Sequence, residues 1–492
     1  MIKPLVLAEG DTIGIVSPSW GGAGAFPHRV EAGIRYLQSM GYKVKLAEHA
    51  ANQDGFVSDS AENRAQDIHD MFRDPDVKMI LAAIGGDHSC HLLPLLDFDL
   101  IRQNPKIFMG YSDITVLNVA IWQQTGLTTF NGPALLTDFA EFPRMFEYAE
   151  QYFLKAVTKP KPIGKIEPSP QWTEEFLEWE TKADQKRPRN MTDSTGWNWL
   201  KAGFGEGPLI GGCIESLQHL RGTPYWPDWE GAILFIETSE DKPSPATVDG
   251  ILMDYENMGV LAQLSGMLVG RPMSYSEQEK QQLREIILAR TEKFNFPIIS
   301  DMDFGHTAPQ FTLPLGCEAR IDTNRALFEI VEAAVRNVNG TSVSLAAIVG
   351  ELEVINDEFP TFVNKRTGEI VSVSSEAMAA AEGKRPMENV LDWEQEMVET
   401  ASDIINSDEY LPLPSAFDIH EYDIMRRFSE RYPDEEISRS LLAAIRGSGA
   451  FRRFKGTIYH YKIEEEWYDF KVKALAEIAI QWLEDNDLPY TT

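Results

Sequence analysis

Short apolar runs alternate with helical patterns over the first 110 residues, and this alternation restricts the fold more than any other feature of the chain. The runs predict four buried strands, and the patterns between the first three predict two helices. Such alternation indicates a parallel α/β sheet, whose ligands bind at the carboxyl ends of the strands. We expect strands at Thr12–Ser17, Tyr42–Leu46, Val77–Ile84 and Lys106–Gly110, and helices at Arg29–Met40 and Ala61–Phe72.

A serine follows the fourth strand directly, in the run Gly110-Tyr111-Ser112-Asp113, and a helical pattern comes next. A serine between strand and helix has the geometry of a nucleophile elbow. The turn exposes Oγ, and the helix N-terminus supplies N–H groups for an oxyanion. Only half of the G-x-S-x-G pattern is present, so the alternative is that Ser112 merely caps the helix.

A nucleophilic serine needs a histidine as base and a carboxylate that orients it. His306 follows the predicted strand Ile298–Gly305, and Glu237 ends the apolar run Ala232–Ile236. Both residues therefore lie at strand ends, where side chains from different segments converge. The alternatives are a hydrogen-bonded turn histidine and a solvated glutamate at a strand end.

The remaining chain suggests further units. Residues 155–200 read as a linker followed by a long surface loop, and strands return from Gly231 onward. We predict an N-terminal α/β lobe over 1–160, a second mixed lobe over 161–338 and an α-rich α+β domain over 345–492. In that domain we expect a hairpin at Phe362–Val373 and helices at Met387–Asn406, Ala416–Arg431, Glu435–Arg446 and Glu464–Asp485.

The composition restricts the kinds of partner and the cellular compartment that we expect for this chain. A formal net charge of -31 disfavours nucleic acid and anionic lipid, and no apolar run is long enough for a membrane span. The N-terminus lacks the apolar region of a signal peptide, which predicts a cytoplasmic protein. Three widely spaced cysteines, Cys90, Cys213 and Cys317, argue against a disulfide framework or a zinc ribbon.

Over about 335 residues the sequence resembles the serine peptidase family that contains the murein LD-carboxypeptidases and the microcin C self-immunity peptidases. The segments that carry the resemblance are IGIVSPS (near 14–19), AAIGGD (82–87), LLPLLDFDLIRQNPKIFMGYSDIT (92–115), TGLTTFNGP (125–133), GPLIGGCIESLQHLRGTPY (207–225), LFIETSEDKPSP (234–245), GMLVGRP (266–272) and PIISDMDFGHTAPQFTLPLG (297–316).

The resemblance implies a two-lobed LD-carboxypeptidase-like fold and an amide hydrolase that works through an acyl-enzyme. It implies Ser112 as nucleophile, His306 as base and Glu237 as its orienting carboxylate, with Gly86 and Asp113 donating N–H groups to the oxyanion. It requires no metal and no cofactor, and it implies a homodimer.

Two branches of that family imply different substrates. SEDKPSP after Glu237, the aromatic 155–200 region and GRP at 270–272 resemble the immunity branch, which cleaves aminoacyl- or peptidyl-nucleotides. On this hypothesis Trp197 and Trp199 stack on the nucleobase, and Lys242 meets the phosphate. The alternatives are that these tryptophans fill the loop's own core, that the enzyme is a murein tetrapeptide LD-carboxypeptidase, or that it is a non-catalytic ligand sensor for the C-terminal domain.

Three smaller features stay open. The pair His88 and His91, with Cys90 between them, is interpreted as lining the substrate cleft rather than binding metal, and Cys213 as structural. The C-terminal domain resembles an uncharacterised family of small acidic bacterial proteins, which implies no chemistry. This domain contains a local basic group, which consists of Arg446, Arg452, Arg453 and Lys455. The group is expected either to bind a phosphate or an acidic partner or to pair with Glu464–Glu466.

Overall fold

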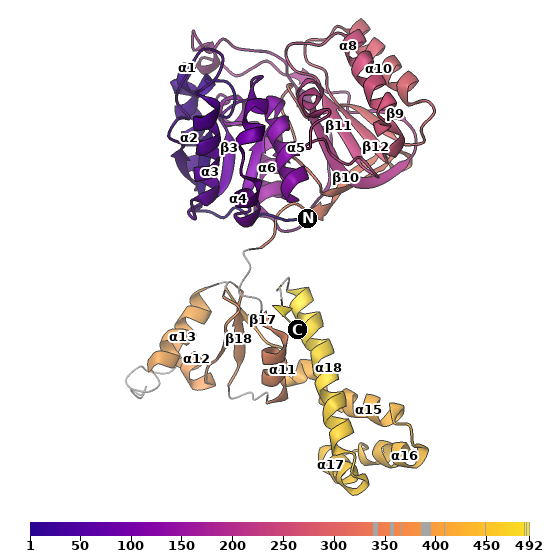
Figure 1. Cartoon of the computed structure of the whole chain (residues 1–492). Coiled ribbons are helices and arrows are strands. Elements are labelled where there is room, and N and C mark those ends of the chain that lie inside the picture. The colour runs from indigo at the N-terminus through magenta and orange to yellow at the C-terminus, as the bar shows by residue number, and fades with distance from the viewer. Residues whose placement is uncertain are drawn as a thin grey trace. The chain divides into compact units, whose positions relative to one another are not determined.

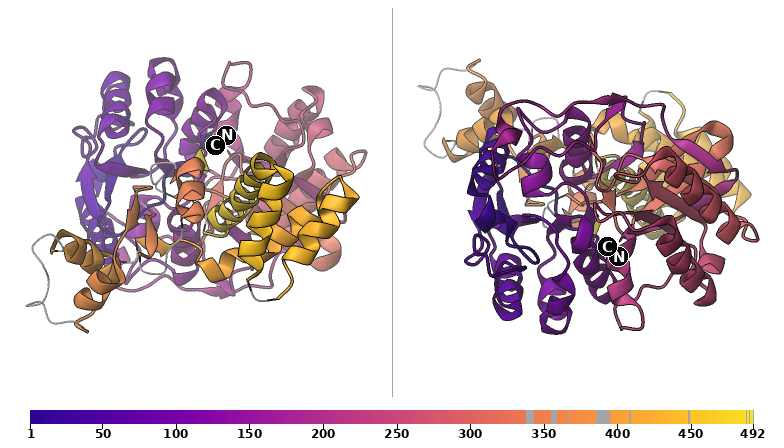
Figure 2. Two further views of the ribbon diagram at one scale, coloured as in Figure 1. Left: turned by 90° about the horizontal axis from the view of Figure 1, so that it is seen from below. Right: turned by 90° about the horizontal axis from the view of Figure 1, so that it is seen from above.

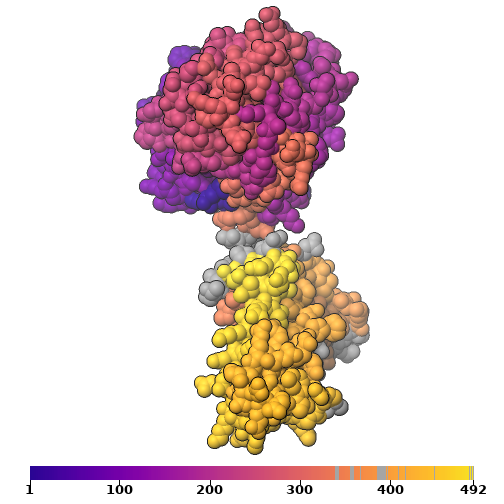
Figure 3. Space-filling model, turned by 90° about the vertical axis from the view of Figure 1, so that its right-hand side faces the viewer, coloured from indigo at the N-terminus to yellow at the C-terminus, as the bar shows by residue number. Residues whose placement is uncertain are grey.

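The computed structural model describes residues 1–337, 343–354, 359–365, 367–384, 395–407, 409–447, 449–486, 488 and 490–491. The chain divides into two compact units, residues 1–337 and 338–492. Figures 1 and 3 colour the first unit from indigo to orange and the second from orange to yellow. Among the described residues, no helix has both the length and the apolar character needed to cross a membrane.

The first sheet of unit 1 is the parallel sheet predicted from the alternation. Its strand order is β14-β5-β4-β3-β1-β2, and only the short β14 runs antiparallel to its neighbour. Helices α3, α4 and α5 pack against one another beside it, and α2 packs against the turn at 135–139. The bounds are β1 Thr12–Val16, β2 Lys43–Leu46, β3 Val77–Ala82, β4 Ile107–Gly110, β5 Phe130–Asn131, β14 Leu313–Pro314, α1 Gly22–Ala25, α2 Pro27–Ser39, α3 Ala61–Arg73, α4 Phe98–Gln103, α5 Thr115–Thr125 and α6 Glu147–Thr158.

The second sheet of unit 1 is mixed, as predicted. Four parallel strands, β10-β11-β12-β13, form its centre, and antiparallel strands extend both sides in the order β6-β16-β15-β10-β11-β12-β13-β9. The bounds are β6 Pro162–Lys165, β9 Asn198–Lys201, β10 Phe204–Cys213, β11 Ile233–Glu237, β12 Gly266–Gly270, β13 Ile298–Met302, β15 Glu318–Asp322, β16 Leu327–Ala333, α7 Ile214–Leu217, α8 Pro245–Asn257, α9 Val260–Gln263 and α10 Glu277–Thr291.

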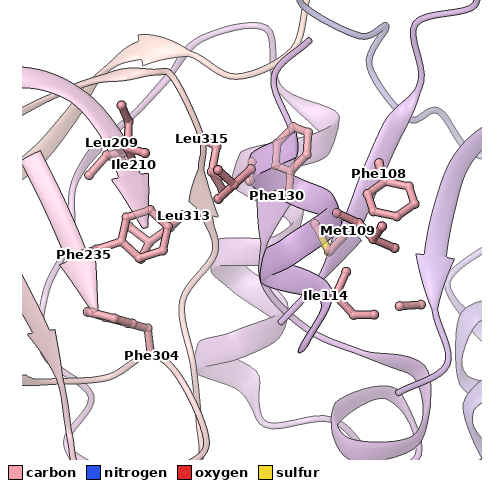
Figure 4. Close-up of a cluster of buried hydrophobic side chains, with 14 of the residues drawn as sticks. Phe108, Met109, Ile114, Phe130, Leu209, Ile210, Phe235, Phe304, Leu313 and Leu315 are labelled. Atoms are coloured by element: carbon pink, nitrogen blue, oxygen red, sulfur yellow. The ribbon is translucent and has the colours of Figure 1, made fainter. Parts of the chain in front are cut away.

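One hydrophobic core runs through both sheets, which lie side by side in Figures 1 and 2. Figure 4 shows Phe108 and Phe130 of the first sheet and Phe235 of the second, with Leu313 between them. Leu313 belongs to β14, a late segment that returns to the first sheet. Because each sheet buries apolar side chains in the same core, the two predicted lobes form a single compact unit.

The segment from 155 to 200 is more regular than the predicted linker and loop. It supplies the end of α6 and both edge strands of the second sheet, β6 and β9, together with a small hairpin of β7 Gln171–Trp172 and β8 Thr192–Asp193. These strands have two to four residues, which is too short for a periodic pattern to reveal them. What remains between β7 and β8 is a long loop.

Unit 2 combines a three-stranded antiparallel sheet with helices, as predicted for an α-rich α+β domain. It has its own hydrophobic core, and α12 and α13 bury a smaller one between them. The bounds are β17 Val343–Ser344, β18 Thr361–Asn364, β19 Ile370–Ser372, β20 Tyr410–Pro412, β21 Tyr490–Thr491, α11 Leu345–Glu353, α12 Ser375–Ala381, α13 Gln395–Asn406, α14 Ala416–Ile419, α15 Glu421–Arg431, α16 Glu435–Ala444, α17 Ala450–Tyr461 and α18 Glu464–Asp485.

The helices predicted for unit 2 need two corrections. The predicted helix Ala416–Arg431 is two helices, because His420 adopts a positive φ of 47° between them. The first residues of the predicted helix Met387–Asn406 lie outside the described residues. The helices α11, α12 and α17 were not predicted. Helix α17 carries part of the basic group, and its Arg453 donates to the carbonyl oxygens of Ala444 and Gly447, near the end of α16.

Candidate active site

Three strand ends of unit 1 bring a serine, a histidine and a glutamate together. Ser112 follows β4 of the first sheet, Glu237 ends β11 of the second, and His306 lies in the turn after β13. Nε2 of His306 is 3.0 Å from Oγ of Ser112, and its Nδ1 is 2.7 Å from Oε2 of Glu237. The site therefore lies where the two sheets meet, at the carboxyl ends of their parallel strands.

The backbone of Ser112 has the conformation of a nucleophile elbow. Its φ is 62°, a left-handed value that non-glycine residues adopt at a cost of about 1–3 kcal/mol. Ser112 begins a short 3₁₀ turn that leads directly into α5. The first N–H groups of such a turn have no partner within the helix, so they are available to a developing oxyanion.

The Gly85-Gly86 turn lies against the elbow. A Cβ atom on Gly85 would come within 2.9 Å of Oγ of Ser112, and one on Gly86 (φ 141°) within 2.8 Å of the nitrogen of Trp20. Asp113 is buried, and its Oδ2 accepts the N–H of Ser89 at 2.8 Å, which ties this turn to the elbow. Gly86 and Asp113, the predicted oxyanion donors, thus belong to two backbone segments held beside Ser112.

A buried ionic network positions the turn that carries His306. Asp303 is 0 % exposed and accepts three hydrogen bonds, from Arg271, from the indole N–H of Trp197 and from the backbone of Ser169. Gly305 lets the turn approach the second sheet, because a Cβ atom there would lie 2.6 Å from Oε2 of Glu237. The imidazole is therefore held against Glu237 by contacts on both sides of the turn.

A second carboxylate also reaches the imidazole. Oε2 of Glu240 lies 2.9 Å from Nε2 of His306, the nitrogen that faces Ser112. Burial by itself would lower the pKa of His306, but Glu237 and Glu240 outweigh it and hold that pKa well above its ordinary value. The same contact lowers the pKa of Glu240 to about 2.

A pocket of about 610 Å³ opens beside the imidazole. Its walls are aromatic as well as charged, and Arg29 lies over the ring of Trp179 at 4.4 Å. A pocket of this size accommodates a ligand of several rings. Its aromatic lining residues are Trp20, Phe26, Tyr111, Phe176 and Trp179.

The predicted substrate-binding residues do not line this pocket. Trp197 is buried, with its indole N–H on Asp303 and its ring packed against Phe311 and Phe328. Trp199 lies in edge strand β9, paired with Ile299. Nζ of Lys242 pairs with Glu279 at 2.9 Å. Trp197 thus packs behind the His306 turn and Trp199 lies at the sheet edge, so neither fills the core of its own loop, which was the alternative considered above.

His88 and His91 are also absent from the pocket lining. The ring of His88 packs on Phe56 at 4.5 Å and on His91 at 5.1 Å. Among the described residues, no group of three or more His, Cys, Asp or Glu side chains has the arrangement of a metal site. Cys213 is buried, with its thiol toward Glu215, and burial raises its pKa well above the ordinary value.

The pocket residues had only a weak signal in the sequence. Trp179 and Phe176 lie in the aromatic 155–200 region. Nothing in the sequence of this region distinguishes the tryptophans that enter the core from those that face the pocket. Glu240 lies three residues after Glu237, and its position beside the imidazole depends on how the turn after β11 folds.

A two-sheet α/β unit with a serine at an elbow, a histidine and a buried glutamate has the architecture of a serine-type hydrolase. Comparison with known proteins specifies the family. The chain belongs to the LD-carboxypeptidase family, whose N-terminal domain matches residues 13–132 and whose C-terminal domain matches residues 206–321. Residues 342–492 match a separate uncharacterised protein family, UPF0158.

Individual relatives cover unit 1 almost completely. The chain is 36% identical to the putative carboxypeptidase YocD of Bacillus subtilis over 319 residues, 64% of this chain and 94% of that protein. It is 33% identical to the microcin C7 self-immunity protein MccF of Escherichia coli over 330 residues, 66% and 94% of the two chains. A structure of MccF in complex with glutamyl sulfamoyl guanosine aligns with a TM-score of 0.63 and 30% identity, covering 68% of this chain and 100% of that one.

Proposed function

We propose that this protein is a serine peptidase that hydrolyses the amide bond of aminoacyl- or peptidyl-nucleotides through Ser112, His306 and Glu237. The observation that carries the proposal is the hydrogen-bond chain from Ser112 Oγ through the imidazole to Glu237, at 3.0 and 2.7 Å. This hydrogen-bond chain supports the roles of nucleophile for Ser112, general base for His306 and orienting carboxylate for Glu237, because acyl transfer uses these groups in this order.

In the proposed mechanism Nε2 of His306 accepts the proton of Ser112, and Oγ attacks the amide carbonyl. The N–H groups of Gly86 and Asp113 donate to the oxyanion. Collapse of the tetrahedral intermediate transfers the proton from His306 to the leaving nitrogen and forms an acyl-enzyme, which water then hydrolyses by the same steps. Glu237 keeps the imidazole oriented and stabilises its charged form throughout.

The aromatic pocket supports a nucleotide substrate. A purine ring stacks on aromatic side chains with about 1–3 kcal/mol per base, and the pocket beside His306 offers Phe26, Phe176 and Trp179. The relative MccF was solved with glutamyl sulfamoyl guanosine, an aminoacyl nucleoside analogue. The aromatic wall therefore takes the role in nucleobase stacking that the sequence suggested for Trp197 and Trp199.

The second candidate is removal of a C-terminal residue from a murein tetrapeptide, which the LD-carboxypeptidase match and the carboxypeptidase relative favour. Mass-spectrometric turnover of an aminoacyl-sulfamoyl adenosine and a murein tetrapeptide, side by side, distinguishes the two. We expect cleavage of the first. Cleavage of the tetrapeptide alone would establish the second candidate instead.

Ser112→Ala tests the chemistry. We expect the rate to fall by roughly 10⁶-fold, the loss typical of removing a triad serine. The melting temperature should stay unchanged, and the variant should still bind the aminoacyl-sulfamoyl adenosine. Activity within about tenfold of the wild type would contradict the assignment of Ser112 as nucleophile.

A further inference from the structure

The imidazole of His306 contacts two carboxylates, whereas acyl transfer requires only one. Glu237 occupies the Nδ1 side, where an orienting carboxylate belongs. Glu240 lies 2.9 Å from Nε2, on the side of the nucleophile, and competes there with Ser112 for the same N–H. This second carboxylate has no role in the mechanism described above.

The turn that carries Glu240 is anchored on both sides. The backbone N–H and the hydroxyl of Ser239 donate to Oε1 of Glu215, at 3.0 and 2.6 Å. On the other side Lys242 pairs with Glu279 at 2.9 Å. Because Ser239 and Lys242, on either side of Glu240, each bind a side chain of another segment, the turn that carries the Glu240 carboxylate is tied at both ends.

Glu240 is one of seven acidic side chains that line the pocket, three of which pair with arginine, and its contact with the catalytic imidazole sets it apart. Glu141, Glu175 and Asp184 each pair with an arginine, at 2.6–2.7 Å. Glu240 has no lysine or arginine partner within the described part of the chain, and its side chain is 64% exposed although it lines the pocket. A negative group thus faces the pocket next to the nucleophile, with only the catalytic imidazole to balance it.

We propose that Glu240 binds the free α-ammonium group of an aminoacyl substrate, so that of the two proposed substrate types the enzyme prefers aminoacyl-nucleotides, with an unblocked amino group, over peptidyl-nucleotides and other N-acylated forms. The inference rests on the proposed amide hydrolysis. In an aminoacyl group the α-nitrogen lies about 2.5 Å from the carbonyl carbon that Ser112 attacks. Nε2 of His306 lies 2.9 Å from Oε2 of Glu240 and 3.0 Å from Oγ of Ser112. The carboxylate of Glu240 is therefore close enough to the attacked carbonyl to bind the α-nitrogen of the same substrate residue.

Binding of the ammonium also releases the base. In the free enzyme Glu240 holds the N–H of a protonated imidazole, and that proton blocks the acceptance of the Ser112 proton. When the ammonium pairs with Glu240, His306 loses its second carboxylate partner, and the pKa of His306 falls. Its Nε2 is then unprotonated and can accept the proton of Ser112. The other titratable groups facing this pair are Glu237, the phenol of Tyr111 and Asp87.

The test compares an aminoacyl-sulfamoyl adenosine with its N-acetylated form, in the wild type and in Glu240→Gln. In the wild type we expect kcat/KM to favour the free amine by roughly 10- to 100-fold, the range of a charge-assisted hydrogen bond. In Glu240→Gln the preference should fall to near unity, because the free amine loses its carboxylate partner while the N-acetylated form meets an imidazole that Glu240 no longer holds protonated. Asp241→Asn removes a charge from the same turn outside the pocket lining and should keep the wild-type preference.

The pH dependence gives a second readout. Because the base must be neutral, kcat/KM rises with pH through the pKa of His306 in the free enzyme. Removing the Glu240 charge lowers that pKa, so the acidic limb of the profile should move to lower pH in Glu240→Gln, on both substrates. An unmoved limb would show that Glu240 does not control the base.

The outcomes separate the two proposals. If the wild type cleaves neither substrate, the proposed amide hydrolysis is itself wrong. If it cleaves both with equal kcat/KM, or if Glu240→Gln slows both equally, the hydrolase assignment stands and the ammonium site is refuted.

Discussion

The two sides of the His306 turn differ in how much they are covered. On the inner side Asp303 and Glu237 are 0 % and 2 % exposed; Asp303 binds Arg271 and Trp197, and Glu237 binds His306. On the pocket side Glu240 and Phe176 are 64% and 58% exposed. Buried, paired groups preorganise the chemistry, and exposed groups are free to meet a substrate. We therefore expect inner-side variants to change kcat and stability, and pocket-side variants to change selectivity.

Glu237→Gln tests the inner side with the largest expected effect. The amide keeps the shape of the carboxylate but no longer stabilises the imidazolium, and it permits the wrong tautomer, so kcat should fall by about 10⁴-fold. Steady-state kinetics with the nucleotide substrate measures this, and an unchanged melting temperature serves as the control. A loss below about tenfold would mean that Glu240 orients the imidazole as well as Glu237 does.

Asp303→Ala extends the test to the network behind the turn. It leaves the guanidinium of Arg271, 5 % exposed, without its carboxylate and the indole N–H of Trp197 without its acceptor. Removing one partner of a buried ion pair costs about 3–5 kcal/mol, which urea unfolding measures for unit 1. Asp303→Asn keeps an acceptor for Trp197 and should lose less stability. Equal stability of all three proteins would contradict the positioning role of Asp303.

The pocket side is tested by a matched pair of aromatic variants. Phe176→Ala removes an exposed wall of the pocket and should raise KM for the nucleotide substrate, since base stacking contributes about 1–3 kcal/mol. Trp197→Phe removes the hydrogen bond to Asp303 and should lower stability by about 1 kcal/mol with KM unchanged. The opposite result, with KM dependent on Trp197 alone, would restore the stacking role first predicted for that tryptophan.

The difference between the inner side and the pocket side of the His306 turn also explains how much of this site the sequence predicted. Glu237 ends a strand, and Ser112 and His306 follow strands, whose apolar runs are visible in the sequence, and parallel strands bring such ends to one edge of a sheet. The family resemblance joined them into one hypothesis. Their meeting across two sheets depends on β14, which returns to the first sheet and has only two residues.

The binding residues were harder to predict because an aromatic side chain has no periodic signal of its own in a loop. Trp197 and Trp179 come from the same irregular region, yet one donates to Asp303 in the core and the other lines the pocket. Their difference arises because β9 adds to the edge of the second sheet, a long-range pairing with β13 that local sequence does not encode. Lys242 likewise forms an ion pair with Glu279 of α10, a helix about 35 residues further along the chain, and local sequence does not encode this pairing either.

Unit 2 supplies the comparison with the smallest expected effect on catalysis. Every residue assigned to the site above lies within residues 1–337, and unit 2 has a separate core that includes Phe454, 1 % exposed. Phe454→Ala should destabilise unit 2 by about 3–5 kcal/mol, which circular dichroism resolves as an earlier transition. Below that transition kcat/KM should remain at the wild-type value, since the side chains around His306 keep all their contacts. A parallel fall in kcat/KM would contradict this independence of unit 1 from unit 2.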